Sequence, residues 1–139
     1  MIANEKRGQI STEYLIIVSF ITFFIIVILG IALIYSGQIR DSIRMSQIEK
    51  FGKKIISSAE TVFYAGEPSK STINVYLPEG VTNIQILEKE IVFTTTLSSG
   101  INKVSYASRV PIEGTISTNE GIKKIQVLAA SDKSLITDT

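Results

Sequence analysis

The stretch that decides the fold is Tyr14–Tyr35, which reads YLIIVSFITFFIIVILGIALIY and contains no charged side chain. As an α-helix it would extend about 33 Å, enough to cross a hydrocarbon layer about 30 Å thick. Ser19 and Thr22 can return their hydroxyls to the helix backbone, and the terminal tyrosines suit the two interfaces of a bilayer. Buried helices of soluble proteins rarely run this long without a charge. The stretch therefore predicts a membrane-crossing helix, or one enclosed in a bundle of identical helices.

The residues that follow continue as an amphipathic helix. Apolar side chains recur at helical spacing from Ile39 to Val62, with charged side chains between them. A secretory signal peptide would instead have an apolar core of about 7–15 residues and then a cleavage site. We expect one nearly continuous helix over Gln9–Ala65 that bends or loosens at Gly37 and Gly52. Its apolar stripe needs a partner surface, which the following domain would supply.

From Ser71 onward the periodicity changes from helical to alternating. Turn residues separate the apolar runs by about 8–12 residues, which is typical of a small sandwich or rolled sheet. The predicted strands are Thr72–Leu77, Asn83–Leu87, Glu90–Leu97, Lys103–Ala107, Ile112–Ser117, Lys123–Ala129 and a short one near Leu135–Thr137. The predicted fold class is α+β, a long hydrophobic and amphipathic helix followed by a small antiparallel β-sandwich or rolled-sheet domain.

The composition removes several kinds of chemistry. The 139 residues include no cysteine and no histidine, so thiolate nucleophiles, disulfides and the commonest general base are absent. The formal net charge is +1, and no basic patch interleaved with aromatic residues indicates a nucleic-acid partner. Phosphate-binding glycine loops and nucleophile elbows are missing as well. We therefore expect a protein that is not an enzyme and that uses no cofactor or metal.

Two groups of carboxylates in the β-region are the only candidates for chemistry there. Glu88 and Glu90 flank Lys89 on an alternating segment, so the pattern predicts that they share one strand face. A solvated strand face is a commoner cause of this pattern than a catalytic pair. Asp132 and Asp138 could bind a cation, but residues with the spacing of a metal-binding loop do not surround them.

A more specific signal precedes the apolar run. Gln9, Ser11 and Glu13 stand at alternate positions directly ahead of it and follow Gly8. This segment resembles the archaeal type IV pilin-like proteins with class III signal peptides, whose motif is a Gln, a Ser and a Glu at alternate positions. The family pattern has a Leu four residues after the Glu, where this chain has the similarly apolar Ile17.

The resemblance implies processing followed by assembly. A prepilin peptidase would cut between Gly8 and Gln9 on the cytoplasmic side, so that the mature chain begins at Gln9. Glu13 would then pair with the new amino group of a neighbouring subunit and set the assembly register. Without assembly, Glu13 would be a helix-start carboxylate near the helix dipole, with Ser11 or Thr12 as a cap.

Together with the periodicity, the resemblance predicts a division of the chain into a cytoplasmic leader (1–8), a transmembrane or filament-core helix (9–37), an amphipathic extension (38–66) and an exported β-domain (67–139). The expected function is a pilin-like structural subunit of an archaeal surface filament or pseudopilus. Its partners would be the membrane, further copies of the chain, the prepilin peptidase and the pilus assembly machinery. The alternative is a single-pass membrane protein that does not polymerise and whose extracytoplasmic β-domain binds a ligand or an envelope partner.

The distribution of charge argues against this topology. Positive charge near a membrane usually marks the cytoplasmic side. The leader has a net charge of +1, whereas residues 40–54 have a net charge of +3. Only Arg40 and Arg44 would lie close to the membrane, because the other cations extend along the helix. We therefore expect the C-terminal domain to be extracytoplasmic.

Overall fold

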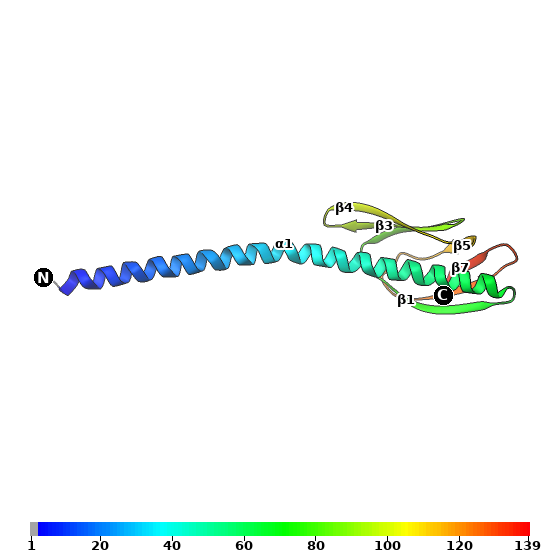
Figure 1. Cartoon of the computed structure of the whole chain (residues 1–139), viewed down its shortest axis with the longest axis horizontal. Coiled ribbons are helices and arrows are strands. Elements are labelled where there is room, and N and C mark those ends of the chain that lie inside the picture. The colour runs from blue at the N-terminus through cyan, green and yellow to red at the C-terminus, as the bar shows by residue number, and fades with distance from the viewer. Residues whose placement is uncertain (1–2) are drawn as a thin grey trace. The chain divides into compact units, whose positions relative to one another are not determined.

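The computed structural model describes the backbone of residues 3–139 and the side chains of residues 11–139. Within them one helix, α1 (Ala3–Ala65), precedes seven strands, which confirms the α+β fold class (Figure 1). The strands are β1 (Lys70–Leu77), β2 (Val81–Leu87), β3 (Glu90–Leu97), β4 (Gly100–Ala107), β5 (Ile112–Thr115), β6 (Gly121–Ala129) and β7 (Ser134–Asp138). Every strand end lies within three residues of its predicted position.

The predicted C-terminal end of α1 is confirmed, whereas its start differs from the prediction. The helix ends at Ala65 as predicted, because Gly66 takes a φ of +75° and its N–H donates to the C=O of Phe63 at 3.1 Å. It begins at Ala3, upstream of the expected start at Gln9, since most of the residues between are good helix formers. The chain divides after Ile39, and Arg40–Thr139 forms a compact unit of its own.

The β-strands form two sheets. One has the order β1-β6-β7-β5, and the other is the meander β2-β3-β4. Four of the pairs are antiparallel as expected, but β5 and β7 run parallel, from Ile112↔Ser134 to Thr115↔Thr137. Residues 116–120 reverse the direction of the chain after β5. The space of one strand remains between β5 and β6. The final strand fills that gap, and its hairpin with β6 makes it parallel to β5.

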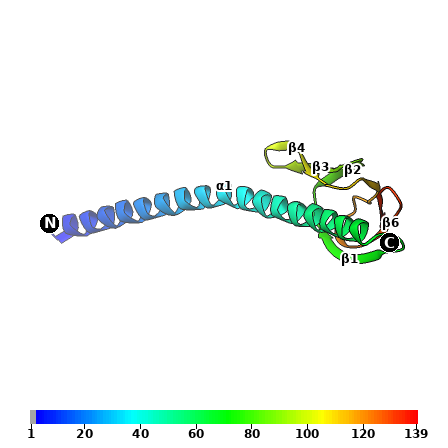
Figure 2. The same ribbon diagram turned by 45° about the vertical axis from the view of Figure 1, so that its right-hand side comes forward.

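The apolar stripe of α1 forms one side of the domain core. Phe51, Ile55 and Ala59 are at most 1% exposed, and the rings of Phe51 and Phe93 meet edge to face with centroids 5.8 Å apart. In Figures 1 and 2, β3 and β4 lie on one side of this part of the helix and β1 lies on the other. The other core residues include Val75, Leu77, Val81, Ile91, Ile125, Val127 and Ile136. The domain is thus the partner that the stripe was predicted to need.

Polar contacts hold the same part of α1 to the β1-β6-β7-β5 sheet and to the loops. The buried hydroxyl of Ser134 donates to the C=O of Ala59 at 2.8 Å. Further contacts join Asp41 to the N–H of Ser98, Arg44 to Glu79, Lys54 to the C=O of Asn74, and Glu60 to the N–H of Arg109. The amphipathic half of α1 is therefore part of the domain fold.

Gly52 is a site of close packing between α1 and the second sheet, inside an unbroken helix, where the sequence predicted a place of loosening. A Cβ at Gly52 would lie 2.7 Å from Cδ2 of Tyr106 and 3.1 Å from Cε2 of Phe93. Atoms this close force the two rings, or the helix, to move.

We expect Gly52→Ala to lower the free energy of unfolding by about 1–3 kcal/mol, because the cost of overpacking exceeds the helix propensity that alanine adds. Thermal unfolding of the full chain in detergent micelles, followed by near-UV circular dichroism, measures the change. Gly30→Ala is the matched control, since a Cβ at Gly30 meets nothing within 4 Å. Equal melting temperatures for the two variants would show that the rings move aside without cost.

Candidate functional site: the exposed apolar helix

The main candidate site is the apolar surface of the first part of α1. Every residue from 11 to 36 is exposed, and large side chains such as Phe20 and Leu33 are 63% and 76% exposed. Contiguous apolar surface of this extent on a soluble monomer marks a site of interaction with protein or membrane. In the part of the chain that the structure describes, α1 is the one helix long and apolar enough to cross a membrane.

The hydroxyl of Ser19 in this segment is bonded to the helix backbone, whereas no such bond is found for Thr22, where the sequence predicted a second one. The Ser19 hydroxyl donates to the C=O of Leu15 at 2.7 Å, as the sequence predicted. The rings of Phe20 and Phe24 are in contact along the same helix, with centroids 4.8 Å apart and their planes tilted by 58°. A helix pairs its backbone N–H and C=O groups within itself, so this segment can enter an apolar medium without leaving its backbone groups unpaired.

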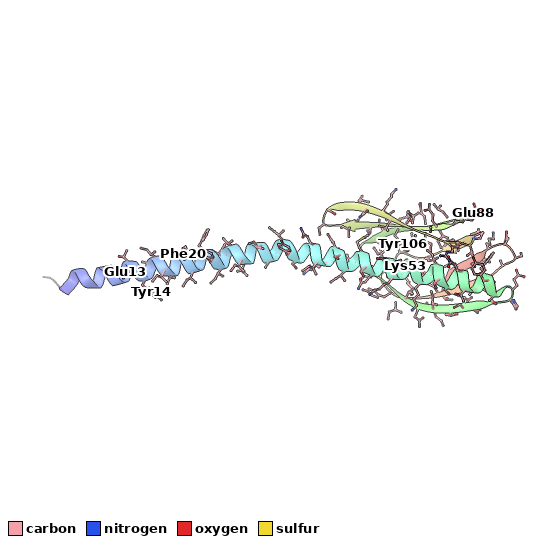
Figure 3. The ribbon with its side chains drawn as sticks, in the orientation of Figure 1. Glu13, Tyr14, Phe20, Lys53, Glu88 and Tyr106 are labelled. Carbon is pink, nitrogen blue, oxygen red and sulfur yellow. The ribbon has the colours of Figure 1, made fainter. Side chains whose placement is uncertain are left out.

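Glu13 stands at the start of this apolar surface, one residue before Tyr14 (Figure 3). Its side chain is exposed, and the next charged residue along the chain is Arg40. A carboxylate that enters an apolar environment is costly unless a cation pairs with it. Glu13 therefore needs a partner wherever the apolar surface is covered.

The structure describes only part of the rest of the motif. Ser11 is exposed, but residues two apart on a helix project about 200° from each other, so Ser11 and Glu13 point to nearly opposite sides. The side chain of Gln9 lies outside the described residues, and the processing site between Gly8 and Gln9 stays a prediction. Of the motif, Glu13 is thus the one ionisable group that the structure places beside the apolar surface.

The structure contradicts the predicted common face of Glu88 and Glu90. Leu87 at the end of β2 pairs with Glu90 at the start of β3, so Glu88 and Lys89 form a two-residue hairpin turn. The turn is fixed to the next loop, because the N–H of Ser108 donates to the C=O of Lys89 at 2.7 Å. Alternation along a strand does not extend through such a turn. Glu88 and Glu90 therefore do not form a carboxylate pair on one strand face.

Asp132 and Asp138 belong to different parts of the domain. Asp132 lies in the turn between β6 and β7, whereas Asp138 ends β7 and accepts hydrogen bonds from Ser117 and from Lys123, the latter at 3.4 Å. Lys123 also donates to the hydroxyl of Ser117, so the three side chains are joined to one another. The three side chains therefore fasten the end of β7. Among the described residues, no group of three or more His, Cys, Asp or Glu side chains could hold a metal ion.

The contacts of Asp138 make the domain sensitive to acid. Burial alone would raise the pKa of the Asp138 carboxyl, but hydrogen bonds from Ser117 and the charge of Lys123 outweigh burial and lower the pKa below its usual 3.8. A carboxyl with a lower pKa in the folded state stabilises the fold above its unfolded pKa and loses that contribution as the pH falls through the folded pKa.

We therefore expect the melting temperature of the wild type to fall more steeply below about pH 4 than that of Asp138→Asn, which cannot titrate. Thermal unfolding across a series of acidic buffers measures both slopes. Parallel curves for the two proteins would contradict the role given to Asp138.

Comparison of the chain with models of protein families, with characterised proteins and with solved structures finds no match. A functional interpretation therefore depends on the chain's own residues and geometry.

Proposed function

We propose that the chain is a pilin-like structural subunit that assembles through its N-terminal helix into a surface filament. The observation that carries the proposal is the uncharged, exposed surface of residues 14–35, with Glu13 at its start. The segment Gly8, Gln9, Ser11 and Glu13, which resembles a class III signal peptide, supports the same function.

The two halves of α1 differ in how their apolar side chains are covered. In the second half, Ile48, Phe51 and Ile55 are buried by the chain's own sheets. In the first half, the side chains from Tyr14 to Tyr35 have no such cover. Because burial of one large apolar side chain contributes about 1.5–3 kcal/mol, the first half has a strong drive to find an apolar environment. Lipid provides that environment before assembly, and parallel helices of other copies provide it afterwards.

Cleavage after Gly8 would create the partner that Glu13 needs. It would remove Glu5, Lys6 and Arg7 and leave a positively charged amino group on Gln9. In a bundle of such helices, the amino group of one copy can pair with Glu13 of the next copy. The pair forms only at one axial offset between the helices, so it would fix the register of each added subunit. A simple anchor has no use for this arrangement.

Cell fractionation distinguishes the filament subunit from a membrane anchor that does not polymerise. Shearing the cells should release the chain in a sedimentable fraction, and antibodies to the β-domain should label filaments in that fraction. An integral membrane protein of the same host serves as the control and should stay with the cells. If the chain is found only in the detergent-soluble membrane fraction, the alternative is the better account.

A further inference from the structure

Strand β4 forms a free edge of the β2-β3-β4 sheet. It follows β3 through a two-residue turn, so Leu97 and Gly100 form the hydrogen-bonded pair next to that turn. Hydrogen-bonded and non-hydrogen-bonded pairs alternate along two antiparallel strands. The N–H and C=O groups of every second residue of β4 therefore point away from β3, and these residues are Ile101, Lys103, Ser105 and Ala107.

The described residues leave this edge without backbone partners. In Figures 1 and 2, β4 lies at the outer margin of the domain. Within residues 3–139, the backbone hydrogen bonds made outside the helix and the strand pairs include none to a residue of β4. The free edge of β1 differs, because Lys54 of α1 donates to the C=O of Asn74 at 3.0 Å and partly closes it.

The usual protections of a free edge are largely missing from β4. Natural edge strands are kept single by shortness, by bulges, by proline or by several charges. β4 has eight residues without proline, and its register with β3 runs unbroken from Leu97↔Gly100 to Glu90↔Ala107. It carries a single charged residue, Lys103, and Ile101 is 76% exposed. An edge of this length can accept a further strand.

A second β4 matches this edge in one antiparallel register, in which Val104 lies opposite Val104 of the other copy. Ile101 then lies opposite Ala107, and all the outward backbone groups of both edges are paired. Lys103 lies opposite Ser105, a neutral residue. Sliding the copies by two residues in one direction places Lys103 opposite Lys103, where like charges destabilise the pair. Sliding them in the other direction leaves Ile101 without a partner.

We propose that β4 pairs with β4 of a second copy in this register, so that the two three-stranded sheets join into one. The contact uses the same surface on both copies and is closed by a two-fold axis. Successive subunits of a helical filament are not related by such an axis, so the contact does not add subunits to a filament. It links filaments, or single chains, side to side. The inference is therefore independent of the proposed function.

Disulfide formation in the full chain, solubilised in detergent micelles, tests the register, because the chain has no cysteine. Val104→Cys places a thiol opposite the same thiol of the other copy, in a non-hydrogen-bonded pair whose Cα atoms lie about 4.5 Å apart. Asn102→Cys is the matched control. Asn102 lies opposite Tyr106 in this register, so the two copies of residue 102 are about 13 Å apart and out of reach of a disulfide.

Under mild oxidation, Val104→Cys should form a disulfide-linked dimer at least about tenfold faster than Asn102→Cys, because pairing of the strands gives its thiols a high effective concentration. Asn102 is the more exposed of the two residues, so random collision would favour the control instead. Equal rates, or a faster rate for Asn102→Cys, would overturn the pairing of β4.

A proline at an outward N–H separates edge pairing from folding. Ser105→Pro removes no hydrogen bond between β3 and β4, because the N–H of Ser105 points away from β3, but it blocks an added strand. In the Val104→Cys chain it should lower the rate of dimer formation to that of Asn102→Cys and leave the near-UV circular dichroism unchanged. A rate that stays high in the folded double variant would also overturn the pairing.

The inference and the proposed function can fail separately. If Val104→Cys forms no dimer but the wild type forms filaments, the pairing of β4 is wrong and the filament function stands. If the dimer forms and the wild type forms no filament, the pairing stands without the proposed function.

Discussion

Filament yield is expected to fall at least about tenfold when Glu13 is replaced by glutamine, a loss of only about 1.4 kcal/mol per added subunit. Glutamine keeps the size and polarity of the side chain but removes the charge that would pair with the amino group of a neighbour. The same change lowers the cost of placing the helix in lipid, because a neutral amide is easier to desolvate than a carboxylate. The variant should therefore accumulate in the membrane at the wild-type level or above.

The ratio of chain in the sheared fraction to chain in the membrane fraction measures this effect. Glu67→Gln is the matched control, because Glu67 is an exposed carboxylate beyond the end of α1. It should assemble at the wild-type yield. Normal filament yield for Glu13→Gln would mean that Glu13 acts only as a helix-start carboxylate.

Gly114→Ala is expected to destabilise the β-domain by at least about 4 kcal/mol, a loss comparable with the whole stability of a small domain. Gly114 has a φ of +150°, and a Cβ there would lie 1.9 Å from the backbone oxygen of Ile136. That oxygen cannot move aside, because Gly114 and Ile136 are partners in the parallel pair of β5 and β7. The substitution should separate these strands.

Protease resistance and near-UV circular dichroism of the full chain in micelles would show the loss of the domain. Gly121→Ala controls for backbone strain, since Gly121 has a φ of +119° but a Cβ there meets nothing within 4 Å. It should cost about 1–3 kcal/mol and leave the domain folded. If both variants melt at the same temperature, steric exclusion at Gly114 is wrong.

Local patterns explain why much of the fold could be predicted from the sequence. Glu90–Leu97 was predicted without error at either end, because Ile91 and Phe93 alternate with outward-facing residues. The same alternation places Thr95 in the core, where its hydroxyl is satisfied by the C=O of Gly80 at 3.0 Å. Residues within a few positions of each other decide such features.

Features that depend on distant residues could not be predicted. The role of Gly52 depends on Tyr106, which only the packing of β4 brings against the helix. The parallel pairing of β5 depends on where β7 enters the sheet, and the sequence of β5 does not contain that information. The Glu88–Lys89 turn lacks the glycine or asparagine of common two-residue hairpins, and the adjacent apolar residues Ile86 and Leu87 were the only sign that alternation had ended.

The surface features of the protein were also predictable from the sequence only in part. The apolar surface before Tyr35 follows directly from composition, and its exposure in the folded chain agrees with the prediction. An apolar groove beside Lys50 and Lys54 does not follow from the sequence, because its lining comes from residues 47–54 of α1 and residues 74–76 of β1, which are at least twenty positions apart. Apolar periodicity in residues 47–54 indicates the core side of the helix but not the opening at its edge.

The most direct test of the central claim is the intact mass and N-terminal sequence of the chain recovered from the cell surface. Processing and assembly as a pilin-like subunit predict a mature chain that begins at Gln9 and retains the whole apolar helix. A surface or membrane form that still carries Gly8 and the residues before it, in a host with an active prepilin peptidase, would contradict that claim.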